Sequence, residues 1–426
     1  MSAVSPVVRG ATRPRPSSGY EQTLQRERHE PEYGILVAIV ALAALGILMV
    51  YSSSAIREYL LKDDTFAIVG PQILWAALGV IAMVLMIRVD YRLLRLVALP
   101  MYVVGIAALL LVFVPSINVV VGGSARWLKI GPLPAVHPAE FMKLALVVYL
   151  AYWFEKRGTS VRRFWSGTVP FLLLLAPVVG LVLLEPDMGT AAVLGGTGGL
   201  LFFLAGANIL HIILLGLVAV PIVAFKFTHD YQLTRIRAWL DPFSVAQTDG
   251  YHSVQGFLAL ALGGILGAGL GESRLAGGLF VPNASNDFIF AIIGEEFGLV
   301  GAGLVIVMFL AFAYLGIRTS LGAPDTFGAL LAAGITGWIC IQAFINIAVV
   351  VGLVPVTGIP LPFVSAGGSS LVISFAAIGI LLSVSRETVE KGTWNDAPAD
   401  RGRGHGRAHL PRLGRRPVAP RPIRAR

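Results

Sequence analysis

Charged side chains and cysteine are scarce in this chain of 426 residues. Asp, Glu, Lys and Arg make up 13% of it, about half of the share that is typical of soluble domains. So few charges cannot cover the surface of a soluble multidomain protein. The single cysteine, Cys340, excludes an intrachain disulfide. Hydrophobic residues reach 56% and the mean hydropathy is +0.78, which predicts a multi-span membrane protein.

Apolar stretches long enough to cross a bilayer recur along the chain. We expect ten spans, near 33–54, 66–87, 97–114, 138–154, 168–184, 189–206, 208–228, 288–316, 326–350 and 366–385. The predicted fold class is therefore all-α, a polytopic membrane domain over 33–385 with a large outer loop at about 229–286. Residues 1–32 and 386–426 are polar, lack apolar periodicity and are expected to be disordered.

Lys and Arg are distributed unevenly between the two faces of the predicted bundle. Ten spans place both termini on one face, together with the loops 88–95 and 155–163, and that face carries most of the basic residues. Basic residues favour the cytoplasmic side, so we expect both termini in the cytoplasm. The tail 386–426 supplies most of the net charge of +9. Aromatic residues do not alternate with the basic residues in this tail. We therefore expect it to be solvated or to contact anionic lipid, and not to bind nucleic acid.

The expected outer loop contains an apolar, Gly-rich run, LALALGGILGAGLG, at 258–271. It is too short and too flexible for a full span. Such a run can dip into a bilayer only where protein or a wet cavity satisfies its backbone hydrogen bonds. It also resembles a dinucleotide-binding loop, but no strand precedes it and no βαβ unit surrounds it.

Ionisable residues near membrane depth are costly and are therefore functional candidates. Those expected on the outer half are Arg126, Glu140, Lys143, Glu185, Asp187, Asp287, Glu295 and Glu296. Because they fall on one face of the membrane, we expect an outward-facing polar cavity. The sequence shows no His or Cys spacing typical of a metal site and no phosphate-binding loop.

Asp287, at the start of the eighth predicted span, has two interpretations. A carboxylate there could act as a general base toward a bound hydroxyl. It could also cap the helix, since Asp is favoured next to the free N–H groups and the positive end of the helix dipole. The two roles are compatible.

Glu140 and Lys143 follow a His-Pro pair at the i and i+3 positions of a predicted helix. This spacing indicates a first-turn acid and a helical ion pair. Alternatively, Lys143 and Arg126 bind an anionic head group, for which the planar fork of Arg is suited.

The other candidates also have structural alternatives. Asp187, followed by Thr190, could cap the sixth span. Arg235 could contact lipid head groups or substrate phosphate, or be an ordinary solvated residue. One of Glu295 and Glu296 should face the bundle and find a polar partner.

Five motifs, in order, resemble those of the SEDS family (shape, elongation, division and sporulation), which includes FtsW, RodA and SpoVE. They are GSARW at 123–127, HPAEFMK at 137–143, EPDMGT at 185–190, NDFIFA at 286–291 followed by GEEFG at 294–298, and a final block from Asn346 to PVTGIPLPFVSAGGS at 355–369. The resemblance covers roughly 33–388. Its largest departure is Ala366, where the family usually has Tyr.

The resemblance implies a peptidoglycan glycosyltransferase in the plasma (inner) membrane of a bacterium. Such proteins polymerise lipid II, an undecaprenyl-pyrophosphate disaccharide-pentapeptide, on the outer face of the membrane. They work beside a class B penicillin-binding protein and other membrane proteins of division or elongation. The family's essential Asp matches Asp287, which would deprotonate the acceptor GlcNAc 4-hydroxyl in an inverting transfer that releases undecaprenyl pyrophosphate.

By the same resemblance, Arg126 and Lys143 would neutralise the pyrophosphate. Other motif positions expected to contact substrate are Trp127, Glu140, Asp187, Arg235, Gln255, Ser365 and Ser369. The resemblance allows a divalent cation, Mg²⁺ or Mn²⁺, as cofactor. The residues at 49–54 and 90–92 favour the division branch, FtsW, over the elongation branch.

Two other functions stay open at the level of sequence. A lipid II flippase would also need buried charges within many spans, although here the charged motifs gather at one face instead of lining a path through the midplane. A non-catalytic scaffold of the division machinery would need no base, and Asp287 argues against it unless that residue is only a cap.

Overall fold

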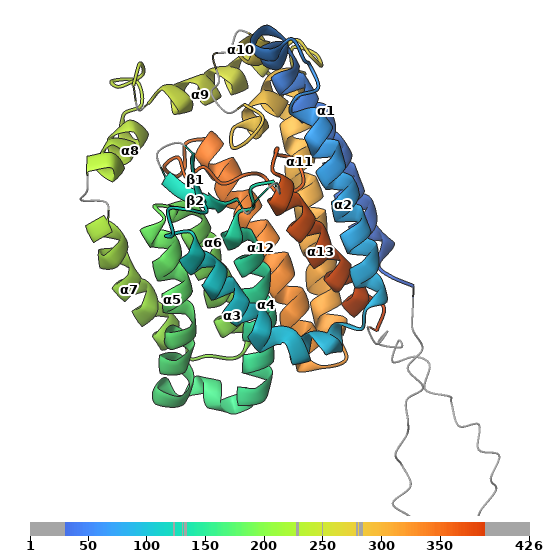
Figure 1. The fold of residues 1–426 in the computed structure, drawn as a ribbon, viewed down its shortest axis with the longest axis vertical. Helices are drawn as coiled ribbons and strands as arrows, with labels where there is room; N and C mark the ends of the chain where they lie inside the picture. Colours follow the sequence, from blue (N-terminus) through green and yellow to red (C-terminus); the bar gives the residue numbers. More distant parts are fainter. Residues whose placement is uncertain are drawn as a thin grey trace, which may run out of the picture. The chain divides into compact units, whose positions relative to one another are not determined.

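The computed structural model describes residues 30–387, apart from 122–123, 130, 132–133, 227–229, 249, 278–279 and 281–283. The predicted disordered arm 1–32 and tail 386–426 lie almost entirely outside the described residues. The described part is mainly helical (Figure 1). Its helices are α1 (Tyr33–Lys62), α2 (Val69–Arg88), α3 (Leu94–Leu111), α4 (Pro138–Arg157), α5 (Val169–Leu184), α6 (Met188–Leu204), α7 (Ile209–Lys226), α8 (Asp230–Leu240), α9 (Tyr251–Gly263), α10 (Arg274–Gly277), α11 (Ile289–Gly322), α12 (Thr326–Val350) and α13 (Gly368–Ser385).

Each of the ten predicted spans coincides with a helix or with most of one. Within the described residues, seven helices are long and apolar enough to cross a membrane: α1, α2, α3, α5, α11, α12 and α13. Helix α6 and the described part of α7 are apolar but shorter. A multi-pass membrane protein is therefore confirmed, whereas the count of ten stays a prediction. Helices α5 and α6 are distinct, since residues 185–187 separate them.

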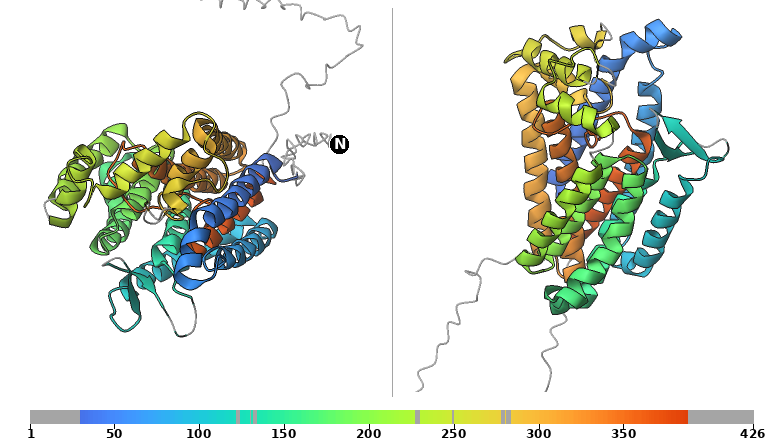
Figure 2. Two further views of the ribbon diagram at one scale, coloured as in Figure 1. Left: turned by 90° about the horizontal axis from the view of Figure 1, so that it is seen from above. Right: turned by 90° about the vertical axis from the view of Figure 1, so that its left-hand side faces the viewer.

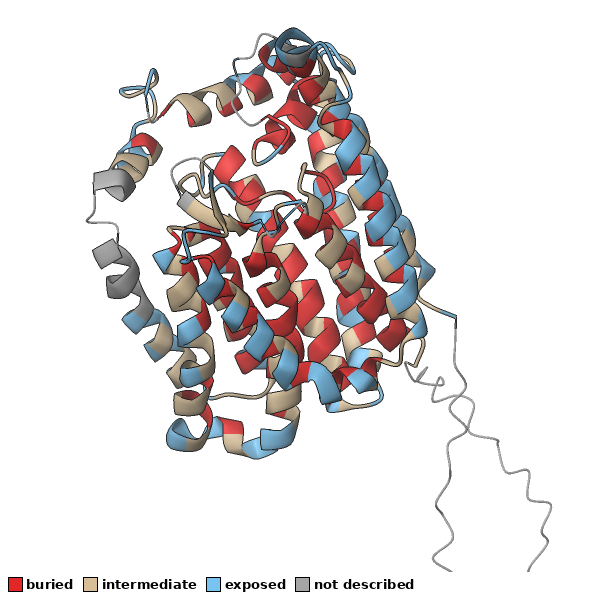
Figure 3. Cartoon of the chain, in the orientation of Figure 1, coloured by how far each residue is buried: buried red, intermediate tan, exposed pale blue. Residues whose placement is uncertain are grey.

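Helices α12 and α13 lie at the centre of the bundle. Helix α13 packs along α2, and α12 packs against α4, α6 and α11. Buried residues concentrate on α4, α6, α12 and α13, whereas α1, α2 and α3 present exposed faces (Figure 3). Those faces are rich in Leu, Val and Ile, so they are the surface that lipid chains would cover.

The two ends of the described chain meet at one end of the bundle. The backbone N–H of Glu32, just before α1, donates to the hydroxyl of Ser385, the last residue of α13 (3.2 Å). We call this the terminal end. The opposite end carries α8, α9 and α10 together with an antiparallel pair of strands, β1 (Asn118–Val121) and β2 (Ser124–Leu128). This hairpin projects from the side of the bundle (Figure 2), and we call its end the hairpin end.

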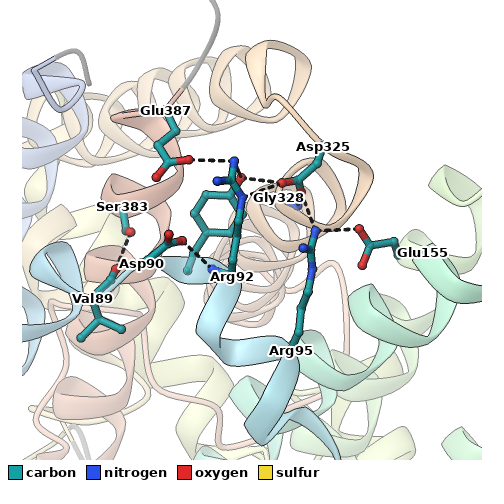
Figure 4. Close-up of polar contacts among 10 residues, drawn as sticks. Val89, Asp90, Arg92, Arg95, Glu155, Asp325, Gly328, Ser383 and Glu387 are labelled. Carbon is teal, nitrogen blue, oxygen red and sulfur yellow. Dashed lines mark hydrogen bonds and ion pairs between the residues drawn. The ribbon is translucent and has the colours of Figure 1, made fainter. Parts of the chain in front are cut away.

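A network of ion pairs joins four helices at the terminal end (Figure 4). Asp325 caps α12 by accepting a backbone N–H from its first turn (2.7 Å). The same carboxylate pairs with Arg92 (3.1 Å) and Arg95 (3.2 Å). Arg92 also pairs with Glu387 after α13, and Arg95 with Glu155 of α4. The network therefore fixes the ends of α3, α4, α12 and α13 relative to one another.

The Gly-rich run packs into a break in α11. Gly298 interrupts that helix with φ +64° and ψ −163°, which frees backbone groups on both sides. Four backbone hydrogen bonds of 2.9–3.2 Å join the run to the break: Leu299 and Val300 donate to Gly264 and Ile265, and Ala268 and Gly269 donate to Glu295 and Glu296. The protein itself therefore satisfies the backbone of this run, as the sequence required.

Replacing Gly298 with Ala is expected to destabilise the protein by about 1–3 kcal/mol. A Cβ there would lie 2.4 Å from the carbonyl oxygen of Ile265, at a positive φ that side chains rarely adopt. Thermal unfolding in detergent measures the loss. Gly303→Ala is the matched control, because a Cβ at Gly303 in the same helix meets no atom within 4 Å. Equal melting temperatures for the two variants would show that the break is not strained.

Candidate active site

Asp287 is not a helix cap. Helix α11 begins at Ile289, the residue in the capping position is Phe288, and no capping side-chain hydrogen bond is formed there. The capping alternative for Asp287 is therefore wrong. Its side chain is partly buried, its Oδ1 has no hydrogen-bond partner among the described residues, and its Oδ2 lies near Gly358.

The loop between α12 and α13, residues 351–367, holds the backbone that carries Asp287. The Nδ2 of Asn346, on α12, donates to the carbonyls of both Asp287 and Ile359 (2.8 Å each). Two further bonds come from the loop: Ser365 donates its hydroxyl to the carbonyl of Asn286, and the Ala366 N–H donates to the carbonyl of Ser285 (2.8 Å). Asn346 and Ser365, which belong to the last of the five motifs, therefore position Asp287.

The charge state of Asp287 is set by burial and by Arg235. Burial raises the pKa of Asp287 to about 6, while its own backbone N–H and Arg235 act in the opposite direction. Arg235, on α8, donates to the carbonyl of Val356 in the α12–α13 loop (3.1 Å). A carboxylate with this pKa is largely ionised at neutral pH and still able to accept a proton, which is what a general base requires.

Arg126 connects the hairpin to the turn between α5 and α6. Its Nε and Nη2 donate to the carbonyls of Glu185 (3.2 Å) and Pro186 (2.6 Å). The next residue, Trp127, sets its ring edge-on to the ring of His137, with 5.3 Å between centroids. Arg126 is only partly buried, so its charge lies at the surface of the hairpin end.

Asp187 caps α6, which confirms the structural alternative for this residue. Its carboxylate accepts from the backbone N–H (3.0 Å) and the hydroxyl (2.9 Å) of Thr190. The Nε2 of His137 lies 3.6 Å from the same carboxylate. Burial lowers the pKa of His137, against the opposing effect of Asp187. Ser369, at the start of α13, accepts a hydrogen bond from the backbone N–H of His137 (3.4 Å).

Glu185 is an acidic residue whose side chain forms no hydrogen bond with the described residues. It is 2% exposed, and neither carboxylate oxygen has a hydrogen-bond partner among the described residues. Burial and the neighbouring Asp187 raise the pKa of Glu185 to about 8, and Arg126 opposes them. Glu185 is therefore largely protonated at neutral pH.

Glu140 and Lys143 form the predicted helical ion pair, with 2.8 Å between Oε2 and Nζ. Lys143 is 2% exposed. Its Nζ also donates to Oε1 of Gln342 (2.7 Å) and lies 5.3 Å from the ring centroid of Trp338. Its ammonium group thus faces protein partners instead of the surface. The sequence did not predict a role for Gln342 or Trp338. Trp338, Gln342 and Asn346 follow one another at intervals of four residues, so they lie on one face of α12.

The α12–α13 loop lies between the two groups of candidates. On one side, Gly189 of α6 approaches Ile359 so closely that a Cβ at Gly189 would lie 2.3 Å from its side chain. On the other side, Gly358 neighbours Asp287. Arg126, Trp127, Asp187 and Ser369 therefore gather around the start of α6, and Asp287, Arg235 and Ser365 around the start of α11.

The remaining candidates lie on α9 and α11. Gln255 is on α9, and its Oε1 is buried without a hydrogen-bond partner among the described residues. Both Glu295 and Glu296 are buried and have polar partners, whereas the sequence predicted this for one of them. Glu295 accepts from the hydroxyl of Ser273, and Glu296 from that of Ser52.

The described residues contain no group of three or more His, Cys, Asp or Glu side chains that could bind a metal ion. Asp187 and Glu140 are already engaged by Thr190 and Lys143. A divalent cation as cofactor stays a prediction.

Comparison with known proteins identifies the family. Residues 33–390 match the family model FtsW/RodA/SpoVE, described as cell cycle protein. The chain belongs to the FtsW/RodA/SpoVE family. It is 38% identical to stage V sporulation protein E of Bacillus subtilis, over 84% of this chain and 98% of that protein. It is 39% identical to the probable peptidoglycan glycosyltransferase FtsW of Geobacter metallireducens, over 84% and 95%.

Solved structures of the FtsW/RodA/SpoVE family share the fold. One, from work on the structural coordination of polymerization and crosslinking by a peptidoglycan synthase complex, matches with a TM-score of 0.69 and 28% identity, over 84% of this chain and 98% of that chain. RodA, the rod shape determining protein of Thermus thermophilus, matches with a TM-score of 0.63 and 26% identity, over 84% and 98%. The SEDS resemblance is therefore confirmed.

Proposed function

We propose that this chain is a peptidoglycan glycosyltransferase that polymerises lipid II, with Asp287 as general base. The observation that carries the proposal is the state of Asp287. Its carboxylate caps no helix, its Oδ1 is unpartnered among the described residues, and its backbone is fixed by Asn346 and Ser365. The relatives named peptidoglycan glycosyltransferases supply the reaction class.

In the proposed reaction, Asp287 takes the proton of the acceptor GlcNAc 4-hydroxyl. The oxygen then bonds to the anomeric carbon of the donor, the bond from that carbon to the phosphate oxygen breaks, and undecaprenyl pyrophosphate leaves with the electron pair. Attack opposite the leaving group inverts the linkage. Arg126, a cation beside the start of α6, neutralises the charge that develops on the pyrophosphate.

We place the hairpin end on the outer face of the bacterial plasma membrane and the termini in the cytoplasm. Arg92 and Arg95 lie at the terminal end, as does Arg157 at the end of α4, and these basic residues support this orientation. A substrate that is anchored in the outer leaflet would then reach Asp287 and Arg126 from the lipid. The match to a synthase complex that coordinates polymerization with crosslinking supports a crosslinking partner, a class B penicillin-binding protein. Membership of the division branch of the family, as opposed to the elongation branch, stays a prediction.

Polymerisation should depend on pH with an acid limb near pH 6. The pKa of Asp287 is raised from 3.8 to about 6, and only the ionised form accepts a proton. Below that pH, kcat/KM should fall about tenfold per unit. Purified protein in liposomes with its transpeptidase partner and lipid II, assayed from about pH 4.5 to about pH 8, measures this.

Thermal unfolding at each pH is the control for loss of the folded protein. Activity that stays constant down to about pH 4.5 would exclude Asp287 as the base. Translocation of lipid II without any glycan product would instead identify a flippase.

A further inference from the structure

Two side-chain amides on one face of α12 bind three backbone carbonyls around the candidate base. Gln342 and Asn346 are spaced i,i+4, so they are neighbours on the helix surface. The Nε2 of Gln342 donates to the carbonyl of Pro360 (3.0 Å). The Nδ2 of Asn346 donates to the carbonyls of Ile359 and Asp287. Consecutive carbonyls of the α12–α13 loop are therefore fixed to one helix that also binds the backbone of Asp287.

The other half of the Gln342 amide is equally engaged. Its Oε1 accepts from Nζ of Lys143 (2.7 Å) and from Nε1 of Trp338 (3.0 Å), and the residue is 1% exposed. The site thus requires an acceptor on one side and a donor on the other, which a side-chain amide provides. Glu, a carboxylate of the same length, would keep the hydrogen-bond acceptor and lose the donor. Met, a thioether of similar size, would lose both the donor and the acceptor.

The loop that Gln342 binds also carries the anchor of Arg235. Arg235 donates to the carbonyl of Val356, four residues before Pro360, and its charge acts on Asp287. The position of the loop therefore contributes to where Arg235 lies relative to the carboxylate. Releasing the carbonyl of Pro360 would shift the charge and the base relative to each other.

We propose that Gln342 is a positioning residue of the glycosyl transfer: by binding the α12–α13 loop it fixes Arg235 against Asp287 and links both to the buried Glu140–Lys143 pair. This inference rests on the proposed function. Gln342 acts through the loop and not by touching substrate. Its effect should fall on the chemical step, because Arg126 is held by the α5–α6 turn and not by Gln342.

The test uses the full chain with its transpeptidase partner in liposomes and lipid II as substrate. Gln342→Glu is expected to lower kcat by about 10- to 100-fold, since a displacement of about 1 Å can cost that much, with KM within about threefold of wild type. The midpoint of the acid limb should rise by about half a unit or more, because a more distant Arg235 lowers the pKa of Asp287 less.

Two further variants complete the design. Gln342→Met removes both the donor and the acceptor of the amide at similar volume. Like Gln342→Glu, it should lower kcat and raise the midpoint of the acid limb. If Gln342→Glu does not fold, Gln342→Met replaces it in the test. Thr336→Val is the matched control. Thr336 lies on α12, is 3% exposed, and its hydroxyl has no hydrogen-bond partner among the described residues, so kcat and the acid limb should not change.

His252, on α9, is a further titratable group to consider in the pH profile, besides Glu185 and His137 near the start of α6. Its ring lies 5.8 Å from that of Phe288, next to Asp287. Burial and Arg235 lower the pKa of His252, so it loses its proton more readily than a free His. The pH profile is therefore repeated with His252→Asn in the wild-type chain and in the Gln342→Glu chain. The comparison separates the titration of His252 from that of Asp287.

The inference is overturned if both folded Gln342 variants keep wild-type kcat and acid limb and lose only melting temperature, since Gln342 is then a core residue. Failure of the proposed function looks different: wild type makes no glycan, or Asp287→Asn remains active. In that event, backbone amide exchange within 355–367 tests the positioning alone. Exchange as slow in Gln342→Glu as in Thr336→Val overturns it, and faster exchange supports it.

Discussion

Asp287→Asn is expected to lower lipid II polymerisation by about 10²- to 10⁴-fold, the range that a general base contributes. The amide has almost the shape of the carboxylate but cannot take the acceptor proton. The hydrogen bonds of Asn346 and Ser365 go to backbone carbonyls, and Asp287 caps no helix, so the fold should be retained. Glycan length on gels, at matched melting temperatures, measures the loss.

Glu272→Gln is the matched control for this experiment. Glu272 is an exposed carboxylate at the same end of the bundle, and its replacement should leave glycan synthesis unchanged. If Asp287→Asn produces glycan chains as well as wild type does, another group accepts the proton and the proposed mechanism fails. If both variants are inactive, the loss reflects general charge at this end and not a base.

Lys143→Met is expected to destabilise the protein by about 3–5 kcal/mol. Removal of the ammonium group leaves the carboxylate of Glu140 buried without its counter-ion, and Gln342 without one of its two donors. The cost of a buried, unpaired charge is much larger than the gain from a well-packed pair. Thermal unfolding in detergent should show a large drop in melting temperature.

The double variant Glu140→Gln, Lys143→Met separates the two roles of the lysine that the sequence left open. It removes both charges, so most of the lost stability should return. A stable and active double variant assigns the pair to structure alone. A stable but inactive one gives Lys143 a role in binding the pyrophosphate. No loss of stability in the single variant would contradict the buried ion pair.

Features set by neighbouring residues could be predicted from the sequence. The ten apolar runs correspond to helices because length and composition alone decide where a bilayer-spanning helix forms. The cap at Asp187 and the pair Glu140–Lys143 depend on spacings of three residues within one helix. Each of these interactions needs only local geometry, which the sequence already contains.

Features that depend on packing between distant segments could not be predicted. Asp287 had two interpretations in the sequence. Its position depends on Asn346 and Ser365, which are distant in the chain, and α11 begins only at Ile289. Gln342 was overlooked because its partners, Lys143 and Pro360, come from different parts of the chain. Arg126 was expected at a pyrophosphate, and it also binds the carbonyls of Glu185 and Pro186, which no local pattern predicts.

The insertion of the Gly-rich run into α11 has a consequence for dynamics. The amides of Leu299 and Val300 are bonded to Gly264 and Ile265, so they can exchange with solvent only when the run leaves the helix. The run and both halves of α11 should therefore open as one cooperative unit. The large segment between α7 and α11 is consequently anchored to α11 at the Gly-rich run.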